Sequence, residues 1–170
     1  MIRLLRQFVS ALRRRLKHPP KPAPPGFVNV EQFSERIEEY RRRGAQIGKD
    51  VRLIGTIDGI NPHLISIGDY SIIGLQSALL AHCPINGGQP CKVGKYVYIA
   101  FNVSVLPGVQ IGDCCVIGAG SVVTRDISPG SVAAGNPAKV LRKLTEDEKA
   151  QMIACMNEHR LFGFEDMVKR

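Results

Sequence analysis

The sequence has no long apolar run, no tryptophan and few aromatic side chains, which make up 6% of its 170 residues. A membrane-spanning helix needs about 20 consecutive apolar residues, and no segment approaches that length, so we expect no helical span. Hydrophobic residues make up 44% of the chain, which excludes a wholly disordered protein. The length suits one compact domain with short appendages.

The cysteines form neither a CxxC motif nor a paired metal-ligand spacing; they are Cys83, Cys91, Cys114, Cys115 and Cys155. A cleavable secretion signal is not expected, because Arg6 interrupts the first apolar region and no small-residue cleavage site follows it. We therefore expect free thiols, no metal site and a cytoplasmic protein.

Acidic residues are absent from residues 1–22, which carry seven of the 23 basic side chains. The remaining residues carry 16 basic and 15 acidic groups and are nearly neutral. A nucleic-acid-binding domain would carry its positive charge over the folded part. The formal net charge of +8 therefore describes one tail, and we expect no nucleic-acid partner.

The basic tail has the pattern of an amphipathic helix over residues 2–17, followed by a spacer with five prolines between residues 19 and 25. Its apolar face comprises Ile2, Leu5, Phe8, Val9, Leu12 and Leu16. Such a helix is suited to the surface of an anionic membrane, here at its cytoplasmic face. A helix that binds a partner or packs on the protein's own assembly is the alternative.

Aliphatic residues return every six positions through the centre of the chain. The unbroken run is Val93, Ile99, Val105, Ile111, Ile117 and Val123. This period fits neither an α-helix nor a flat strand, and it is typical of a parallel β-helix whose aliphatic side chains stack inside. Two steps, Leu53 to Ile67 and Leu79 to Val93, are 14 residues long. We interpret each as two hexads plus two extra residues in a bulged loop.

Four segments follow from these patterns. Residues 1–26 form the basic helix and spacer, residues 27–46 a short helix at about 30–43, residues 47–134 the β-helix, and residues 135–170 a C-terminal segment. Thr145 and Glu148 form a capping box that predicts a helix over about 146–161.

Three phrases in the repeat carry a family resemblance: LPGVQIGD (106–113), IGAGSVVT (117–124) and AGNPAKV (134–140). Over about residues 47–143 the chain resembles the hexapeptide-repeat acyltransferases, and most of all their maltose and galactoside O-acetyltransferase group. The resemblance implies a mainly β fold, a left-handed parallel β-helix with N-terminal and C-terminal helices. It also implies a homotrimer, active sites between subunits and acetyl-CoA as co-substrate.

His82 is the candidate general base. It opens an irregular stretch where the repeat is lost, and a histidine titrates near neutrality, as proton transfer requires. The resemblance places the family's catalytic histidine at the start of this loop. We expect Asp58 and Asn61 to orient His82 or the acceptor. His63 is a weaker second base, and a thiolate of Cys83 is a covalent alternative that we disfavour, because Cys83 falls on a position expected to fill a corner of the solenoid.

The coenzyme positions are also implied by the resemblance. They are Tyr98, Ala100, Phe101, Ala119, Thr124, Arg125, Lys139 and Arg142. The three cations among them can pair with the phosphates of the coenzyme. If the second 14-residue step hides two hexads, Leu79 and Ile99 share a face, and the amides near Ala100 and Phe101 lie close to the level of His82, where they would hold the thioester or its oxyanion.

The predicted function is acetyl transfer from acetyl-CoA to a hydroxyl of a sugar or surface polysaccharide intermediate. A sugar-nucleotide N-acetyltransferase and a non-catalytic scaffold subunit are the alternatives, because nothing in the residues separates a hydroxyl from an amine acceptor. A metal-dependent, carbonic-anhydrase-like β-helix is disfavoured, because it needs three metal-binding histidines and the solenoid offers only His63 and His82.

Overall fold

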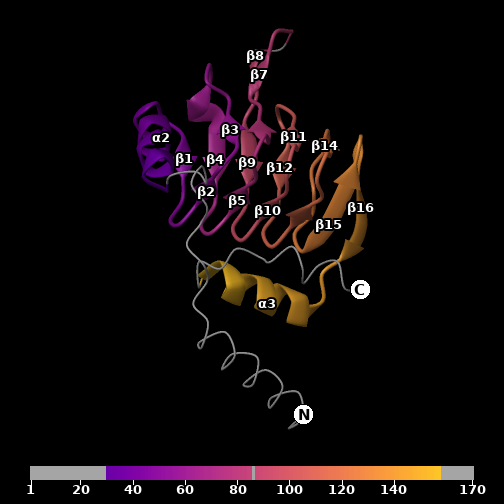
Figure 1. Ribbon diagram of the computed structural model, residues 1–170. Helices are drawn as coiled ribbons and strands as arrows, with labels where there is room; N and C mark the ends of the chain where they lie inside the picture. Colours follow the sequence, from indigo (N-terminus) through magenta and orange to yellow (C-terminus); the bar gives the residue numbers. More distant parts are fainter. Residues whose placement is uncertain (1–29, 86, 158–170) are drawn as a thin grey trace.

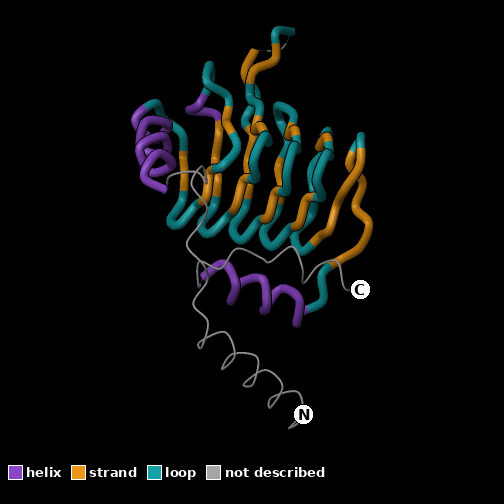
Figure 2. Tube along the Cα trace, in the orientation of Figure 1, coloured by secondary structure: helices purple, strands orange, loops and turns teal. Residues whose placement is uncertain are grey.

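The computed structural model describes residues 30–85 and 87–157. In this part the chain winds into stacked coils, in which short strands alternate with turns at the corners (Figure 1 and Figure 2). The strands of successive coils pair in parallel, so the predicted parallel β-helix is confirmed. The predicted helix over residues 2–17 lies outside the described residues.

The coils have three faces, which we name sheets A, B and C. Sheet A contains β1 (Gln46–Ile47), β4 (Ile65–Ile67), β9 (Cys91–Val93) and β12 (Gln110–Ile111). Sheet B contains β2 (Arg52–Leu53), β5 (Ile72–Ile73), β10 (Tyr98–Ile99), β13 (Val116–Ile117), β15 (Ser131–Gly135) and β16 (Ala138–Lys143). Sheet C contains β3 (Thr56–Ile57), β6 (Ala78–Leu79), β11 (Ser104–Val105) and β14 (Val122–Val123).

The six-residue positions form the core. In sheet B, Ile73 is paired in register with Leu53 on one side and Ile99 on the other, and all three side chains are fully buried. Stacks of the same kind line sheets A and C. Each stack removes branched aliphatic surface from water, and this burial is the main favourable contribution to folding.

Buried serines close the corners between stacks. Ser77 Oγ donates to the carbonyl of Ala100 at 2.7 Å and accepts the N–H of Val103 at 3.0 Å. Ser71 makes the same pair of bonds to Gly94 and Val97 one corner earlier. Each hydroxyl thus satisfies backbone groups of the next coil that are turned away from the sheets.

The two 14-residue steps differ from each other. The first passes through a strand of sheet C, β3 with the buried Ile57, so it joins sheet B to sheet A through sheet C. The second has no such intermediate strand of the coil: β6 in sheet C is followed by a projecting hairpin and then by β9 in sheet A. The expectation that Leu79 and Ile99 share a face is therefore wrong. Leu79 stacks on Val105 in sheet C, whereas Ile99 lies in sheet B.

The helix α2 (Val30–Arg42) covers the first coil, with Ile37 buried in the core (Figure 1). Its arginines donate to carbonyls at the end of the solenoid: Arg36 to Gly55 at 2.9 Å, and Arg41 to Gly48 at 2.8 Å. These bonds satisfy acceptors that a further coil would otherwise take, and they protect the edge from pairing with another chain.

The helix α3 (Glu146–Asn157) crosses the outer face of sheet B, as Figure 1 shows. Met152 and Met156 pack there on Ile72. The predicted capping box is present, since Thr145 Oγ1 accepts the N–H of Glu148 at 3.2 Å and Glu148 Oε2 accepts that of Thr145 at 2.9 Å. Before α3, the strand β16 turns back antiparallel on β15 and ends sheet B.

Candidate functional site around His82

His82 lies where the chain leaves the coil. It begins β7 (His82–Cys83), which pairs antiparallel with β8 (Gly87–Gly88), and this hairpin projects from the solenoid (Figure 1). The imidazole is exposed. A titratable ring on a loop held by a rigid scaffold is well placed to exchange a proton with a bound molecule.

Asp58 directly follows β3 and is bonded to the start of the hairpin. The residue is 7% exposed, and its carboxylate accepts four backbone N–H groups. Oδ1 binds the amides of Ile60 at 2.8 Å and Asn61 at 3.1 Å, and Oδ2 binds those of Ala81 at 2.9 Å and His82 at 2.6 Å. Burial acts to raise the pKa of this carboxyl, but the four donors favour its charged form and the net effect lowers the pKa.

Asn61 brings the same loop to the ring of His82. Its Nδ2 lies 3.5 Å from His82 Nδ1. As placed, the amide NH2 donates to Nδ1, which puts the ring proton on Nε2. A carboxamide turned by 180° instead accepts Nδ1–H with its oxygen, and only this arrangement leaves Nε2 free to take a proton. The structure therefore brings together Asp58, Asn61 and His82, the three residues that the sequence predicts for the acceptor side.

Gly88, a residue without a predicted role, lies where the two loops approach each other. A Cβ atom at Gly88 would lie 2.3 Å from Leu64 Cδ1 and 3.4 Å from Asn61 Nδ2. Leu64 ends the 3₁₀ helix η1 (Pro62–Leu64), so η1 contacts the hairpin at this glycine through the end of the leucine side chain. The adjacent glycines at 87 and 88 in an irregular stretch were the available sequence signal.

Ala100, Phe101 and Ala119 lie at the corner between sheets B and C. Gly120 N–H donates to the carbonyl of Phe101 at 2.9 Å, so the corners of successive coils are in contact, and Phe101 is 49% exposed. The amide of Ala100 is already bonded to the carbonyl of Ile117 at 3.0 Å. It therefore does not serve as the oxyanion donor beside His82 that the sequence predicts. Within one chain, this corner lies before the strands of sheet C and the hairpin lies after one of them, so the two are at opposite ends of these strands.

The remaining predicted coenzyme residues are spread over the later coils. Thr124 and Arg125 are exposed after β14, and Lys139 is exposed on β16. Arg142 makes a bidentate ion pair with Glu148, with N–O distances of 2.7 and 2.9 Å, and this pair raises the pKa of Arg142. Tyr98 does not border His82, because it packs outside sheet B in the cluster beneath α3.

The cysteines nearest the hairpin have different environments. Cys83 is half-buried in β7 and does not fill a corner of the solenoid, so that part of the expectation is wrong. Cys91 occupies the interior instead, where burial raises the pKa of its thiol to about 12. His63 is exposed on η1, beside Gly44.

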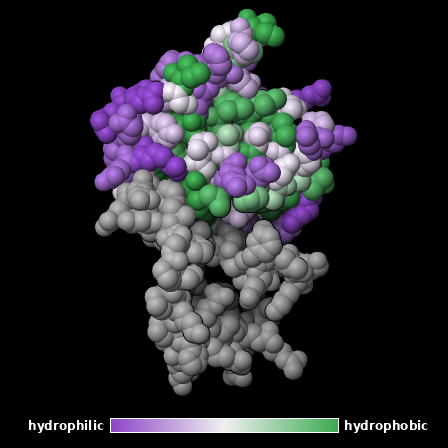
Figure 3. All heavy atoms as spheres, turned by 45° about the horizontal axis from the view of Figure 1, so that its top comes forward, coloured by the Kyte–Doolittle hydropathy of each residue, from purple (hydrophilic) through white to green (hydrophobic). Residues whose placement is uncertain are grey.

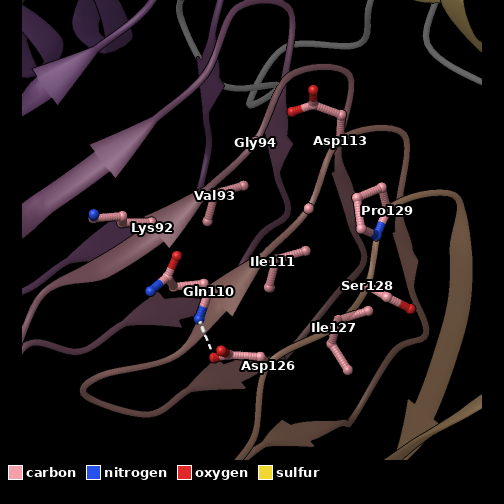
Figure 4. A pocket seen from close by; sticks show the side chains of 11 residues that line it. Lys92, Val93, Gly94, Gln110, Ile111, Asp113, Asp126, Ile127, Ser128 and Pro129 are labelled. Carbon is pink, nitrogen blue, oxygen red and sulfur yellow. Dashed lines mark hydrogen bonds between the residues drawn. The ribbon is translucent and has the colours of Figure 1, made fainter.

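A shallow hollow of about 450 Å³ lies over β9, β12 and the segment after β14 (Figure 4). Its charged side chains are Lys92, Asp113 and Asp126. The backbone N–H of Gln110 donates to Asp126 Oδ1 at 2.7 Å. Neither His82 nor the predicted coenzyme cations line it. Its two carboxylates against one ammonium do not suit a phosphate-bearing coenzyme.

The surface beside the hairpin is apolar over the coils and hydrophilic over α2 (Figure 3). Among the described residues, the large exposed apolar side chains include Leu75 and Phe101 at the corner between sheets B and C, and Ile85 on the hairpin. Within the same residues no cluster of three or more potential ligand side chains could hold a metal ion. No helix in residues 30–85 and 87–157 has the length and hydropathy of a membrane span.

These features define a repeat solenoid with a histidine site at a break in the repeat. A family model described as "Bacterial transferase hexapeptide (six repeats)" matches residues 90–125. The galactoside O-acetyltransferase of Escherichia coli (strain K12) is 50% identical over 100 residues, which are 53% of this chain and 49% of that protein. A putative acetyltransferase of Staphylococcus aureus (strain COL) is 55% identical over 58 residues, which are 34% of this chain and 29% of that protein. The chain therefore spans less than half of the length of these two curated relatives.

Solved structures similar to this chain are also acetyltransferases. A maltose O-acetyltransferase from Clostridium difficile 630 aligns with a TM-score of 0.53 and 28% identity, covering 71% of this chain and 80% of that one. A galactoside acetyltransferase in complex with coenzyme A aligns with a TM-score of 0.55 and 26% identity, covering 72% and 76%. The resemblance to the hexapeptide-repeat acetyltransferases, including the maltose and galactoside group, and the left-handed β-helix fold are therefore confirmed.

Proposed function

We propose that this protein transfers an acetyl group from acetyl-CoA to a hydroxyl of a sugar or of a surface polysaccharide intermediate. The observation that carries the proposal is the exposed imidazole of His82, held by the Asp58–Asn61 loop at the one hairpin that projects from the described coils. The likeness to a maltose O-acetyltransferase and to a galactoside acetyltransferase bound to coenzyme A supports both the reaction and the co-substrate.

The reaction proceeds by direct attack. Nε2 of His82 takes the proton of the acceptor hydroxyl as its oxygen forms a bond to the acetyl carbonyl carbon of the thioester. The tetrahedral intermediate collapses, and the carbon–sulfur bond breaks. Coenzyme A leaves as a thiolate and recovers the proton from the imidazolium. Hydrogen-bond donors that hold the oxyanion would supply much of the rate enhancement.

Coenzyme A would lie along the later coils. Arg125 and Lys139 are exposed cations there and suit its phosphates. Arg142 is held by Glu148 and would have to exchange that partner for a phosphate. The exposed ring of Phe101 offers an apolar contact at the neighbouring corner.

A homotrimer would complete the site. The outward residues of sheet C are small or polar, namely Thr56, Ala78, Ser104 and Val122, and neither α2 nor α3 covers them. Phe101 precedes β11 and His82 follows β6, so the two lie at opposite ends of the strands of this sheet. A second copy packed on sheet C would bring its Phe101 corner to the hairpin of the first, so that each site is shared between subunits.

The basic segment over residues 2–17 would place the trimer on an anionic membrane surface at the cytoplasmic face. Three copies would reinforce one another by avidity. Co-sedimentation of the full chain with phosphatidylglycerol vesicles, compared with the chain lacking residues 1–22, tests this. Equal binding of both would contradict it.

Thiol release from acetyl-CoA, measured with methyl galactoside, methyl glucoside, maltose and an amino-sugar nucleotide, tests the function. We expect turnover with a glycoside and a loss of about 10²- to 10⁴-fold in His82→Ala, the usual contribution of a general base. His63→Ala, which alters the other solenoid histidine, is the matched control. Turnover only with the amino sugar favours the N-acetyltransferase. Unchanged turnover in His82→Ala contradicts the mechanism, and no turnover with any acceptor favours a scaffold subunit.

A further inference from the structure

The Asp58 carboxylate joins the two places where the chain departs from the coil. Its own backbone N–H remains in the sheet, donating to the carbonyl of Leu79 at 2.8 Å. Two of its four amide donors, Ile60 and Asn61, belong to the first irregular loop. The other two, Ala81 and His82, belong to the start of the hairpin. One side chain therefore sets the relative position of both loops.

The bond to His82 is the shortest of the four, at 2.6 Å. It holds the backbone from which the imidazole projects, while Asn61, bound by its own amide to the other carboxylate oxygen, contacts the ring at Nδ1. A carboxylate offers about four lone-pair sites, and Asp58 uses them for four backbone donors. Nothing is left on this buried side chain to accept a hydroxyl from an acceptor.

Resting on the proposed role of His82, we propose that Asp58 is a positioning residue for the base and not a ligand of the acceptor. It fixes the backbone of His82 and, through Asn61, the nitrogen that the ring turns toward the acceptor. In a catalytic histidine, the hydrogen bond made by one ring nitrogen commonly decides which nitrogen carries the proton. A small displacement of a catalytic group greatly lowers the rate of the chemical step, so loss of Asp58 should lower kcat and leave KM nearly unchanged.

Asp58→Asn tests the proposal because it keeps the shape but places an NH2 group against backbone N–H donors. Asp113→Asn is the matched control, since Asp113 also binds one backbone amide, that of Lys95 at 2.8 Å, at a corner away from His82. The readouts are the ring-nitrogen chemical shifts of His82, assigned by their loss in His82→Ala, and steady-state kinetics with acetyl-CoA and the best glycoside of the panel.

We expect Asp58→Asn to move the His82 nitrogen shifts toward those of free imidazole and to lower kcat at least about tenfold, with KM for both substrates within about twofold. Asp58→Glu, which keeps the carboxylate, should recover part of kcat, and it decides the question if the asparagine variant does not fold. Asp113→Asn should change neither readout.

Two results overturn the proposal: unchanged His82 shifts and kcat in Asp58→Asn, or a raised KM for the glycoside at unchanged kcat, which would make Asp58 an acceptor ligand. Retained turnover in His82→Ala is a separate result. It contradicts the proposed role of His82 as the base, and absence of turnover with every acceptor contradicts the proposed function, whereas the nitrogen shifts still report whether Asp58 orients the ring.

Discussion

The coils from β9 to β14 and the coils before β9 contain the same kind of stack but differ in their connections. In the later part, paired inward residues such as Ile99 and Ile117 are 18 positions apart, and no loop interrupts the repeat. In the earlier part, Ile73 and Ile99 are 26 positions apart, and the additional residues form the hairpin that carries His82. The repeat provides a rigid support, and the candidate chemistry lies where the repeat is broken.

The largest difference in stability should separate Leu79 from Ile85. Leu79 is fully buried between Ile57 and Val105, whereas Ile85 is 87% exposed on the hairpin. Leu79→Ala should lower the free energy of unfolding by about 2–5 kcal/mol, and Ile85→Ala by about 0.5 kcal/mol or less. Denaturant unfolding followed by circular dichroism measures both. Equal effects would show that the hairpin belongs to the packed core.

The next largest effect concerns the corner serines. Ser77→Ala removes a hydroxyl that bonds one carbonyl and one amide of the next coil, and both would remain buried without a partner. We expect a loss of about 1–3 kcal/mol in the free energy of unfolding. Ser66, on the outer side of sheet A, is the control, and Ser66→Ala should cost less. A neutral Ser77→Ala would contradict the role assigned to these bonds.

A smaller effect is expected in the pH dependence of stability, through the carboxylate of Asp58 that joins the two irregular loops. The folded-state pKa of Asp58 is depressed below its unfolded value, so its contribution to stability is present above that unfolded value, about 3.9. It is lost as the pH falls through the folded pKa. The free energy of unfolding of the natural protein should therefore fall more steeply below about pH 4 than that of Asp58→Asn. Parallel acid-denaturation curves would contradict this, and Asp113→Asn is the control.

The smallest effect on activity is expected at Cys83. Because the proposed mechanism has no covalent intermediate, Cys83→Ser should keep turnover within about twofold. Cys91→Ser places a hydroxyl in the apolar interior and should instead lower the thermal midpoint. Thiol release from acetyl-CoA and thermal unfolding measure the two effects. Loss of turnover in Cys83→Ser at an unchanged midpoint would favour the covalent alternative.

Local patterns were sufficient for much of the solenoid. The residues at the six-residue period are the buried stack, and the capping box at Thr145 and Glu148 begins α3 within one residue of its predicted position. Both signals are short in range, because an inward side chain or a helix cap is decided within a few residues. Periodicity failed at the step from Leu79 to Val93, since a hairpin and two hexads give the same spacing.

By itself, the sequence determined the parallel β-helix, the position of His82 at a break in the repeat and the two helices that cover the end and one face of the solenoid. Only the tertiary structure decided that Leu79 stacks on Val105, that Tyr98 lies under α3 and that Asp58 binds the amide of His82. The physical reason is register. Which residue of one coil meets which residue of the next is set by side-chain stacking between positions 18 to 26 residues apart, and no local pattern encodes it.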